Sequence, residues 1–143
     1  MLKFQIILLE WGYNTKCLEK NTYTKNEILD YKAINYEKEF SDIDKNCNYN
    51  RHMGIIISNN FINKHFDTIL VAPITTKNNS DLITHKNKFV LLKENYPKLK
   101  NNSVIMLNKI KEIDKNRIIK ELFFLKDYHH KEFNKRLKFI LGV

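Results

Sequence analysis

Five residues near the middle of the chain have side chains suited to chemistry on a phosphate group: Arg51, His52, Thr75, Thr76 and Lys77. Arginine and lysine can stabilise charge that develops on a phosphoryl oxygen, and a hydroxyl can donate to that oxygen or orient it. RNA carries its own nucleophile, the 2′-hydroxyl. A protein that only positions this hydroxyl in line with the adjacent phosphate needs no metal and no covalent residue. The alternatives are a phosphate-binding rim without catalysis and plain turns at strand ends.

Two short apolar segments could hold these side chains. Met53–Ser58 and Thr68–Pro73 are rich in isoleucine and valine and have polar flanks, which is the pattern of buried strands. A polar loop is expected between them. Arg51 opens the first predicted strand, and a Thr-Thr-Lys turn, Thr75–Lys77, closes the second. If the strands pair as a hairpin, polar groups from both ends converge on one edge of a small sheet, where we place the function.

Other apolar segments predict further short strands. They are Phe89–Leu92, Val104–Leu107 running on through Ile110 and Ile113, and Arg117–Leu125. Residues 1–22 fit either a strand or a buried helix turn. Five or six short strands with a closing helix predict an α+β fold, a small, strongly bent antiparallel sheet or partial barrel with peripheral helices. A length of 143 residues predicts a single domain, 1–143.

Two helices are predicted from capping and spacing. Thr24 and Glu27 have the form of a capping box, which predicts a helix from Lys25 to about Ala33. Asp127 is expected to cap a closing helix. The apolar residues of that helix fall on one face at helical spacing, and a glycine is placed to end it. These residues are Phe133, Leu137, Ile140 or Leu141, and Gly142.

The charge of the chain indicates a class of partner. It has 25 Lys and Arg against 16 Asp and Glu, a formal net charge of +9. Nucleic acid is the commonest polyanion for such a chain, and the alternative is a protein whose lysines only keep it dispersed. Lysine far outnumbers arginine, since the only arginines are Arg51, Arg117 and Arg136. Arg51 gains weight because guanidinium offers phosphate a fixed planar fork.

Other chemistries find little support in the sequence. The five histidines, of which His129 and His130 are expected to face solvent, show no metal-type spacing, and three glycines provide no phosphate-cradling loop. We therefore expect no metal and no cofactor. Cys17 and Cys47 are interpreted as free thiols in a reducing compartment. The apolar run Ile6–Leu9 is too short to cross a membrane, so we expect a cytoplasmic protein without a membrane partner.

The segment Arg51–Val143 resembles the MazF/PemK superfamily of toxin endoribonucleases. The matching features, in order, are an arginine opening a strand of the form R-x-x-G-I-I-I-S-N-N, and a second strand ending A-P-I-T-T-K. The segment Ser103–Ile118 follows, and then an amphipathic helix that finishes near Leu141. Four pieces in this order cover about two-thirds of the chain.

This resemblance implies a sheet of SH3-barrel type and a particular enzymatic reaction. The activity is metal-independent, sequence-preferring cleavage of single-stranded RNA that leaves 2′,3′-cyclic phosphate and 5′-hydroxyl ends. Arg51 would act on the phosphate or as general acid, and Thr75 would stabilise or orient the phosphate. Thr76 and Lys77 would line the same turn, with His52 a weaker member. The residues expected to bind RNA are Arg51, His52, Lys77, Lys86 and Lys88.

Departures from the common MazF form indicate a branch and a partner. His52 stands where a proline is usual, and residues 41–50 contain no glycine. The form of His52–Ile57, with Gly54 in the strand, looks more like the ToxN (type III) branch, which has a role in phage defence and is held by a repeated RNA antitoxin. The expected partners are such an RNA, or alternatively an acidic protein antitoxin with a toxin homodimer, and substrate mRNA or antitoxin precursor. The alternative functions are a non-catalytic RNA-binding module and a gyrase poison of the same fold.

Overall fold

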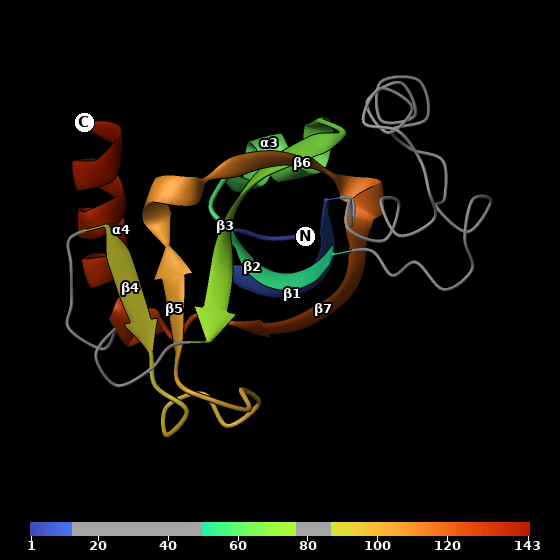
Figure 1. Cartoon of the computed structure of the whole chain (residues 1–143). Helices are drawn as coiled ribbons and strands as arrows, with labels where there is room; N and C mark the ends of the chain where they lie inside the picture. Colours follow the sequence, from blue (N-terminus) through green and yellow to red (C-terminus); the bar gives the residue numbers. More distant parts are fainter. Residues whose placement is uncertain (13–49, 77–86) are drawn as a thin grey trace, which may run out of the picture. The chain divides into compact units, whose positions relative to one another are not determined.

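The computed structural model describes residues 1–12, 50–76 and 87–143 (Figure 1). Residues Met1–Leu9 and His52–Val143 form one compact unit, and Glu10–Arg51 form a second, of which residues 10–12 and 50–51 are described. Several expectations lie outside the described residues: the helix from Lys25, both cysteines, Lys77 and Lys86. The expectation of a single domain remains a prediction.

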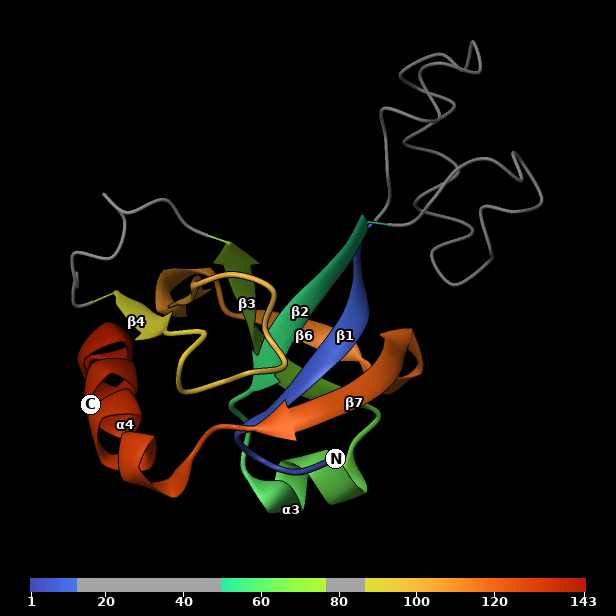
Figure 2. The ribbon, with the colours of Figure 1, turned by 90° about the horizontal axis from the view of Figure 1, so that it is seen from below.

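Seven strands form one antiparallel sheet in the order β4-β5-β3-β2-β1-β7, with β6 also paired to β3. The strands are β1 (Gln5–Gly12), β2 (Asn50–Ile56), β3 (Thr68–Thr76), β4 (Lys88–Leu91), β5 (Ser103–Met106), β6 (Lys111–Asp114) and β7 (Ile118–Phe124). Two α-helices accompany them among the described residues, α3 (Asn60–His65) and α4 (Asp127–Leu141). Figure 2 shows β1 between β2 and β7, with α4 beside β4. The predicted α+β fold with a bent antiparallel sheet is confirmed.

The predicted hairpin is present, but its connection and its end differ from the prediction. Strands β2 and β3 pair antiparallel from Met53↔Ile74 to Ile56↔Val71. The connection contains helix α3 instead of only a polar loop. The side chain of Asn59 caps this helix by accepting the Ile62 N–H at 2.9 Å, which stabilises its first turn.

Buried polar groups hold this helix to the hairpin. The Ser58 hydroxyl donates to the Asn63 side-chain oxygen and accepts the Leu70 N–H at 3.1 Å. The Asn63 amide donates to the Ser58 carbonyl at 2.8 Å. Each polar side chain of this cluster therefore has a hydrogen-bond partner in spite of its burial. These bonds attach the helix to the hairpin and offset the free-energy cost of burying the polar groups.

Strand β3 is longer than predicted because it pairs with two further segments. Thr75 and Thr76 were expected in a turn, but they continue the strand opposite Val104 and Ser103 of β5. The first half of β3 pairs with β6, from Thr68↔Asp114 to Val71↔Lys111.

The predicted continuous strand from Val104 through Ile113 is consequently wrong. A 3-10 turn, Leu107–Lys109, separates β5 from β6, so that each pairs with its own half of β3. A second 3-10 turn, Lys115–Arg117, separates β6 from β7, and β7 occupies most of the predicted strand segment Arg117–Leu125.

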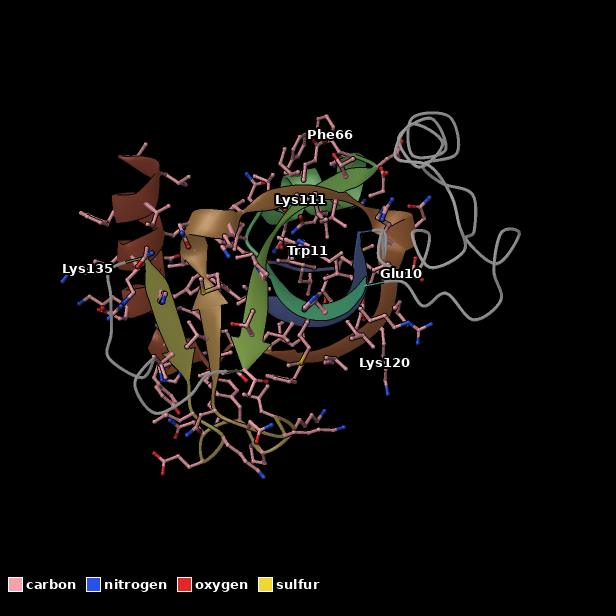
Figure 3. The ribbon with its side chains drawn as sticks, in the orientation of Figure 1. Glu10, Trp11, Phe66, Lys111, Lys120 and Lys135 are labelled. Atoms are coloured by element: carbon pink, nitrogen blue, oxygen red, sulfur yellow. The ribbon has the colours of Figure 1, made fainter. Side chains whose placement is uncertain are left out.

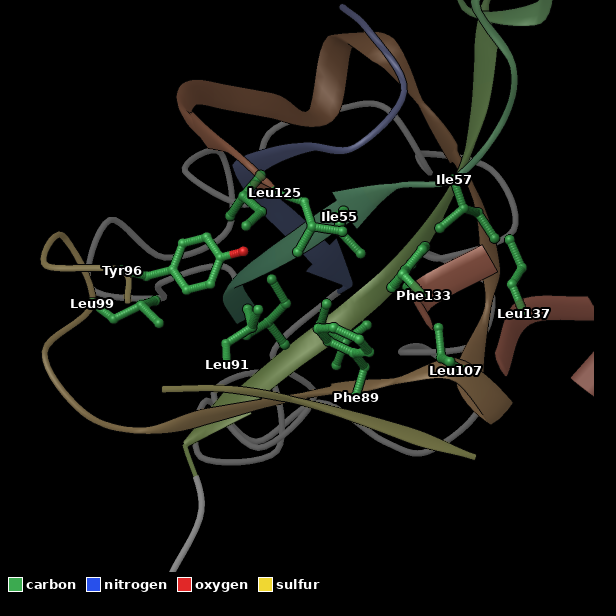
Figure 4. Packing of buried hydrophobic residues seen from close by; sticks show 14 residues of the cluster. Ile55, Ile57, Phe89, Leu91, Tyr96, Leu99, Leu107, Leu125, Phe133 and Leu137 are labelled. Atoms are coloured by element: carbon green, nitrogen blue, oxygen red, sulfur yellow. The ribbon is translucent and has the colours of Figure 1, made fainter. Parts of the chain in front are cut away.

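Helix α4 closes the core of the larger unit, which is drawn in Figure 4. Phe133 and Leu137 are buried as predicted, whereas Leu141 is 56% exposed and Ile140 packs against the core instead. Gly142 ends the helix in the left-handed region at φ 74°, and its N–H reaches the Phe139 carbonyl. The expected Asp127 cap is wrong, since the helix begins at Asp127 and its N-cap Lys126 makes no side-chain bond.

The two histidines at the start of α4 are half-buried, so the expectation that they face solvent is wrong. The His130 ring stacks on Phe4 with centroids 4.0 Å apart, and its Nε2 lies 2.9 Å from the Leu125 carbonyl. The His129 ring packs on Tyr96. In the described ranges, no helix is long and apolar enough to cross a membrane.

Candidate functional site

The carboxyl end of β3 and the start of β2 lie at one end of the hairpin. Met53 pairs with Ile74, and the next residues outward along the two strands are His52 and Thr75. Both side chains are partly buried, while Thr76, one residue further, is exposed. The sheet therefore gathers His52, Thr75 and Thr76 at the edge where the sequence predicted polar groups to converge.

Thr75 has an unusual hydroxyl. Its Oγ1 is buried and has no hydrogen-bond partner in the part of the chain that the structure describes. A buried hydroxyl without a partner costs about 1–3 kcal/mol, and each such group in a folded protein calls for an explanation. A ligand oxygen that enters this edge would supply the missing partner.

Arg51 is the second residue of β2, and its side chain is exposed. It belongs to the unit Glu10–Arg51, and the adjacent His52 begins the part of β2 that belongs to the larger unit. An exposed guanidinium with a planar set of donors is suited to bidentate binding of phosphate.

Lys88, expected to bind RNA with these residues, does not come to the same end. In the β4–β5 pair, Lys88 lies opposite Met106 and Leu91 lies opposite Ser103. Ser103 in turn lies opposite Thr76 in the β3–β5 pair. Lys88 therefore begins β4 at the opposite end from Thr76. Its carbonyl accepts a hydrogen bond from Arg136 Nη1 at 2.8 Å. Its expected RNA-binding role remains a prediction.

The segment between β4 and β5, residues 92–102, was given no role in the predicted site, so its relation to the site was missed. Ser103, which follows it, is 2% exposed and lies opposite Thr76. Lys93, Lys98 and Lys100 are exposed along this segment. Their density could have been noticed in the sequence, but their approach to the Thr76 end depends on the β3–β5 pairing. Among the described residues, no group of three or more His, Cys, Asp or Glu is placed to hold a metal ion.

Comparison with known proteins supplies a family. The family model described as PemK-like, MazF-like toxin of type II toxin-antitoxin system matches residues 39–141. A curated relative, Endoribonuclease MazF of Staphylococcus saprophyticus, is 37% identical over 90 residues, 62% of this chain and 72% of the relative.

Solved structures share the fold at low identity. A mycobacterial endoribonuclease in complex with its cognate antitoxin has a TM-score of 0.62 at 15% identity, over 100% of this chain and 96% of that chain. The Mycobacterium tuberculosis toxin MazF-mt6 has a TM-score of 0.56 at 15% identity, over 65% of this chain and 88% of that chain. At these identities the similarity concerns the fold alone.

The matches decide between the branches considered from the sequence. The predicted membership of the MazF/PemK superfamily and the predicted enzyme class, an endoribonuclease, are confirmed. The ToxN-type branch, with its RNA antitoxin and phage-defence role, is not supported, because the matching family is described as type II. His52 and Gly54, on which that branch rested, are therefore variations within the MazF-like family.

Proposed function

The chain belongs to the family of PemK-like, MazF-like toxins of type II toxin-antitoxin systems, and from this premise we propose that it cleaves single-stranded RNA without a metal. The products are a 2′,3′-cyclic phosphate and a 5′-hydroxyl. The principal groups are Arg51 and Thr75, as the resemblance to the family motif implies. The observation that carries the proposal is the buried, unpartnered Oγ1 of Thr75.

The proposed mechanism uses the nucleophile of the substrate. The 2′-hydroxyl loses its proton to solvent water as its oxygen attacks the adjacent phosphorus, the bond from phosphorus to the 5′-oxygen breaks, and the 5′-oxygen leaves as a hydroxyl. The Thr75 hydroxyl donates a hydrogen bond to a phosphoryl oxygen on which negative charge develops, which stabilises the transition state. Arg51 neutralises the same group and protonates or stabilises the leaving 5′-oxygen. Thr76 and Lys77 line the approach, and His52 is a weaker contributor.

Purified protein, freed of antitoxin, should cleave single-stranded RNA in EDTA. Arg51→Ala and Thr75→Ala should each lower kcat/KM by about 100-fold or more, the usual loss when one transition-state donor is removed. Lys120→Ala is the matched control, because Lys120 is an exposed cation that extends outward from β7 (Figure 3). Its cleavage rate should equal that of the wild type.

Three outcomes would contradict this proposal in different ways. Wild-type rates for both Arg51→Ala and Thr75→Ala would show that the site lies elsewhere. RNA binding without any new 5′-hydroxyl ends, across several RNAs, would favour the non-catalytic RNA-binding module. Cleavage only after magnesium is restored would remove the metal-independent mechanism.

We also propose that the neutralising partner is an acidic protein antitoxin bound to a toxin homodimer. The net charge of +9 supports a polyanionic partner, and the type II family supports a protein rather than an RNA. The toxin should be purified with the product of a neighbouring reading frame, before and after treatment with ribonuclease. A complex that survives the treatment agrees with this proposal, and one that dissociates contradicts it.

A further inference from the structure

A pocket of about 170 Å³ lies between the segment 92–102 and the end of β7. Its wall includes Tyr96, Pro97, Lys98, Phe123, Phe124 and Lys126. The Tyr96 ring, 3% exposed, packs near Phe123 with centroids 5.8 Å apart. Phe124 stays 48% exposed at the end of β7, where it pairs with Gln5 of β1. An aromatic wall with one exposed ring can receive another flat ring.

The pocket is preformed. The Tyr96 hydroxyl accepts the Lys126 N–H at 3.0 Å and lies 2.6 Å from Nδ1 of His129. These two contacts hold the Tyr96 ring, and with it the 92–102 segment, against the start of α4. A ligand that enters does not have to order this wall, so little binding energy is lost to rearrangement.

Two cations flank the apolar wall. The Lys98 Nζ lies 3.3 Å from the Leu122 carbonyl, which engages one of its three donors and leaves the others available. The Lys126 Nζ lies 5.7 Å from the Tyr96 ring centroid. Asp127 is the adjacent acid, but its carboxylate is fully exposed and 3.9 Å from His130 Nε2. The positive charges are therefore available to a phosphate at the rim.

The pocket is continuous with the proposed cleavage site along the chain. The segment 92–102 ends at Ser103, and Ser103 faces Thr76 across the β3–β5 pair. In Figure 1 this gold segment lies beyond the arrowhead of β3. Lys93 and Lys100 are exposed along it, and Glu94 is its only acid. A polyanionic strand that leaves Thr75 can follow these lysines to the pocket.

We propose that this pocket binds one unpaired base of the RNA substrate, away from the scissile phosphate. The base stacks on Phe124 and Pro97, and the flanking phosphates bind Lys98 and Lys126. This inference rests on the proposed function, since it assigns a second contact to the same RNA. An RNA is favoured over an apolar protein side chain because the rim is cationic and the segment leads from the cleavage edge. Stacking on an exposed aromatic ring, with lysines for the backbone, is a general mode of single-strand recognition.

The test is binding of a labelled single-stranded RNA methylated at every 2′-oxygen, which cannot form a cyclic phosphate. Phe124→Ala should raise Kd about 5- to 150-fold, the usual loss of one base-stacking contact, and Phe124→Trp should restore it. Lys98→Gln should weaken binding and lower the salt slope by about 0.7, as for one lost phosphate contact. Ile119→Ala and Lys120→Gln are controls on the same strand, both exposed. They should bind like the wild type.

An equal Kd for Phe124→Ala and wild type, with both proteins folded, overturns the proposal. The proposal is also overturned if Phe124→Ala binds RNA normally but no longer binds a protein antitoxin, because the pocket would then be part of the antitoxin-binding surface. Should Phe124→Ala fail to fold, Lys98→Gln and a photocross-link from 5-bromouridine to residues 92–102 or 118–126 decide the matter. The methylated RNA is not cleaved, so this binding test does not depend on catalysis. Loss of binding in Phe124→Ala would support the pocket even if the wild type cleaved no RNA. Absence of cleavage by the wild type would refute the proposed function alone.

Discussion

The hydroxyl of Tyr96 lies 2.6 Å from Nδ1 of His129, in hydrogen-bond contact with it, and accepts the backbone N–H of Lys126 at 3.0 Å. Tyr96 and His129 are 33 residues apart. This pair joins the segment that leads from the candidate site to the first turn of α4. Burial raises the pKa of Tyr96, so the phenol keeps its proton for this bond. His129 must be neutral to accept it, with its own proton on Nε2.

Tyr96→Phe should destabilise the protein. It removes a buried hydroxyl and leaves the Lys126 N–H and the His129 nitrogen without their partner, which costs about 1–3 kcal/mol. Unfolding in urea measures the change. Tyr128→Phe is the matched control, because Tyr128 is 63% exposed and should tolerate the loss of its hydroxyl. Equal midpoints for the two variants would show that the Tyr96 bonds contribute nothing.

Stability should depend on pH through His129. Burial, followed by the charges of Lys126 and His130, lowers the pKa of His129 from its ordinary value of 6.5. Between the lowered pKa and 6.5 the unfolded chain binds more protons than the folded protein, so the free energy of unfolding decreases as pH falls through this window.

The measurement is the free energy of unfolding of wild type and His129→Gln from pH 8 to the acid limit of reversible folding. The advantage of the wild type should shrink below about pH 6.5, where the unfolded histidine takes up a proton. The exposed His65 on α3 provides the control variant His65→Gln. A constant difference between wild type and His129→Gln over the whole range would contradict the prediction.

Thr75→Val should separate stability from activity. Valine has nearly the shape of threonine and suits a strand, and the removed hydroxyl has no partner among the described residues. Removal of a buried polar group without a partner costs no hydrogen bond, so the free energy of unfolding should stay equal or rise. RNA cleavage should fall by about 100-fold or more if this hydroxyl stabilises the transition state.

Thr75→Ser is the matched variant, because it keeps the hydroxyl and should retain most of the cleavage rate. Parallel urea unfolding and cleavage assays decide. Marked destabilisation by Thr75→Val, with unchanged cleavage, would assign the hydroxyl a structural role in place of the proposed one.

Gly54→Ala should disrupt the packing of the hairpin. A Cβ at this position would lie 2.5 Å from Val71 Cγ1 and 3.0 Å from Leu9 Cδ2, in a fully buried part of the sheet. Overpacking of this kind costs about 1–3 kcal/mol. In a Val71→Ala background the added cost should be smaller, because the obstructing methyl group is absent.

Gly142→Ala is the contrasting variant. A Cβ there meets nothing within 4 Å, but φ is +74°. Its cost is therefore backbone strain of about 1–2 kcal/mol, independent of Val71. Equal costs of Gly54→Ala in the two backgrounds, measured by urea unfolding, would exclude the Val71 contact as the cause.

The successes and errors of the sequence reading have recognisable physical origins. The Ile- and Val-rich composition of residues 53–58 and 68–73 and their polar flanks predicted a hairpin that is present, since strand patterns are local. The break at Leu107–Lys109 was missed because apolar residues resume directly after it, at Ile110 and Ile113. Only pairing with the two halves of β3 shows where one strand ends and the next begins. The burial of His129 and His130 was missed for a similar reason, since their partners Tyr96 and Phe4 are distant in the chain.

The sequence by itself determined which chemical groups are available: an arginine at the start of one strand, threonines at the end of another, a surplus of lysine, and a motif order shared with MazF-like toxins. Residue types and their spacing carry this information, because a short strand can be recognised from its own residues. Tertiary structure decided that the Thr75 hydroxyl is buried without a partner, that Lys88 lies at the other end of β4, and that the 92–102 segment leads from Thr76 to an aromatic pocket. These properties depend on strand register and on contacts between distant residues, which the folded core fixes and no local pattern encodes.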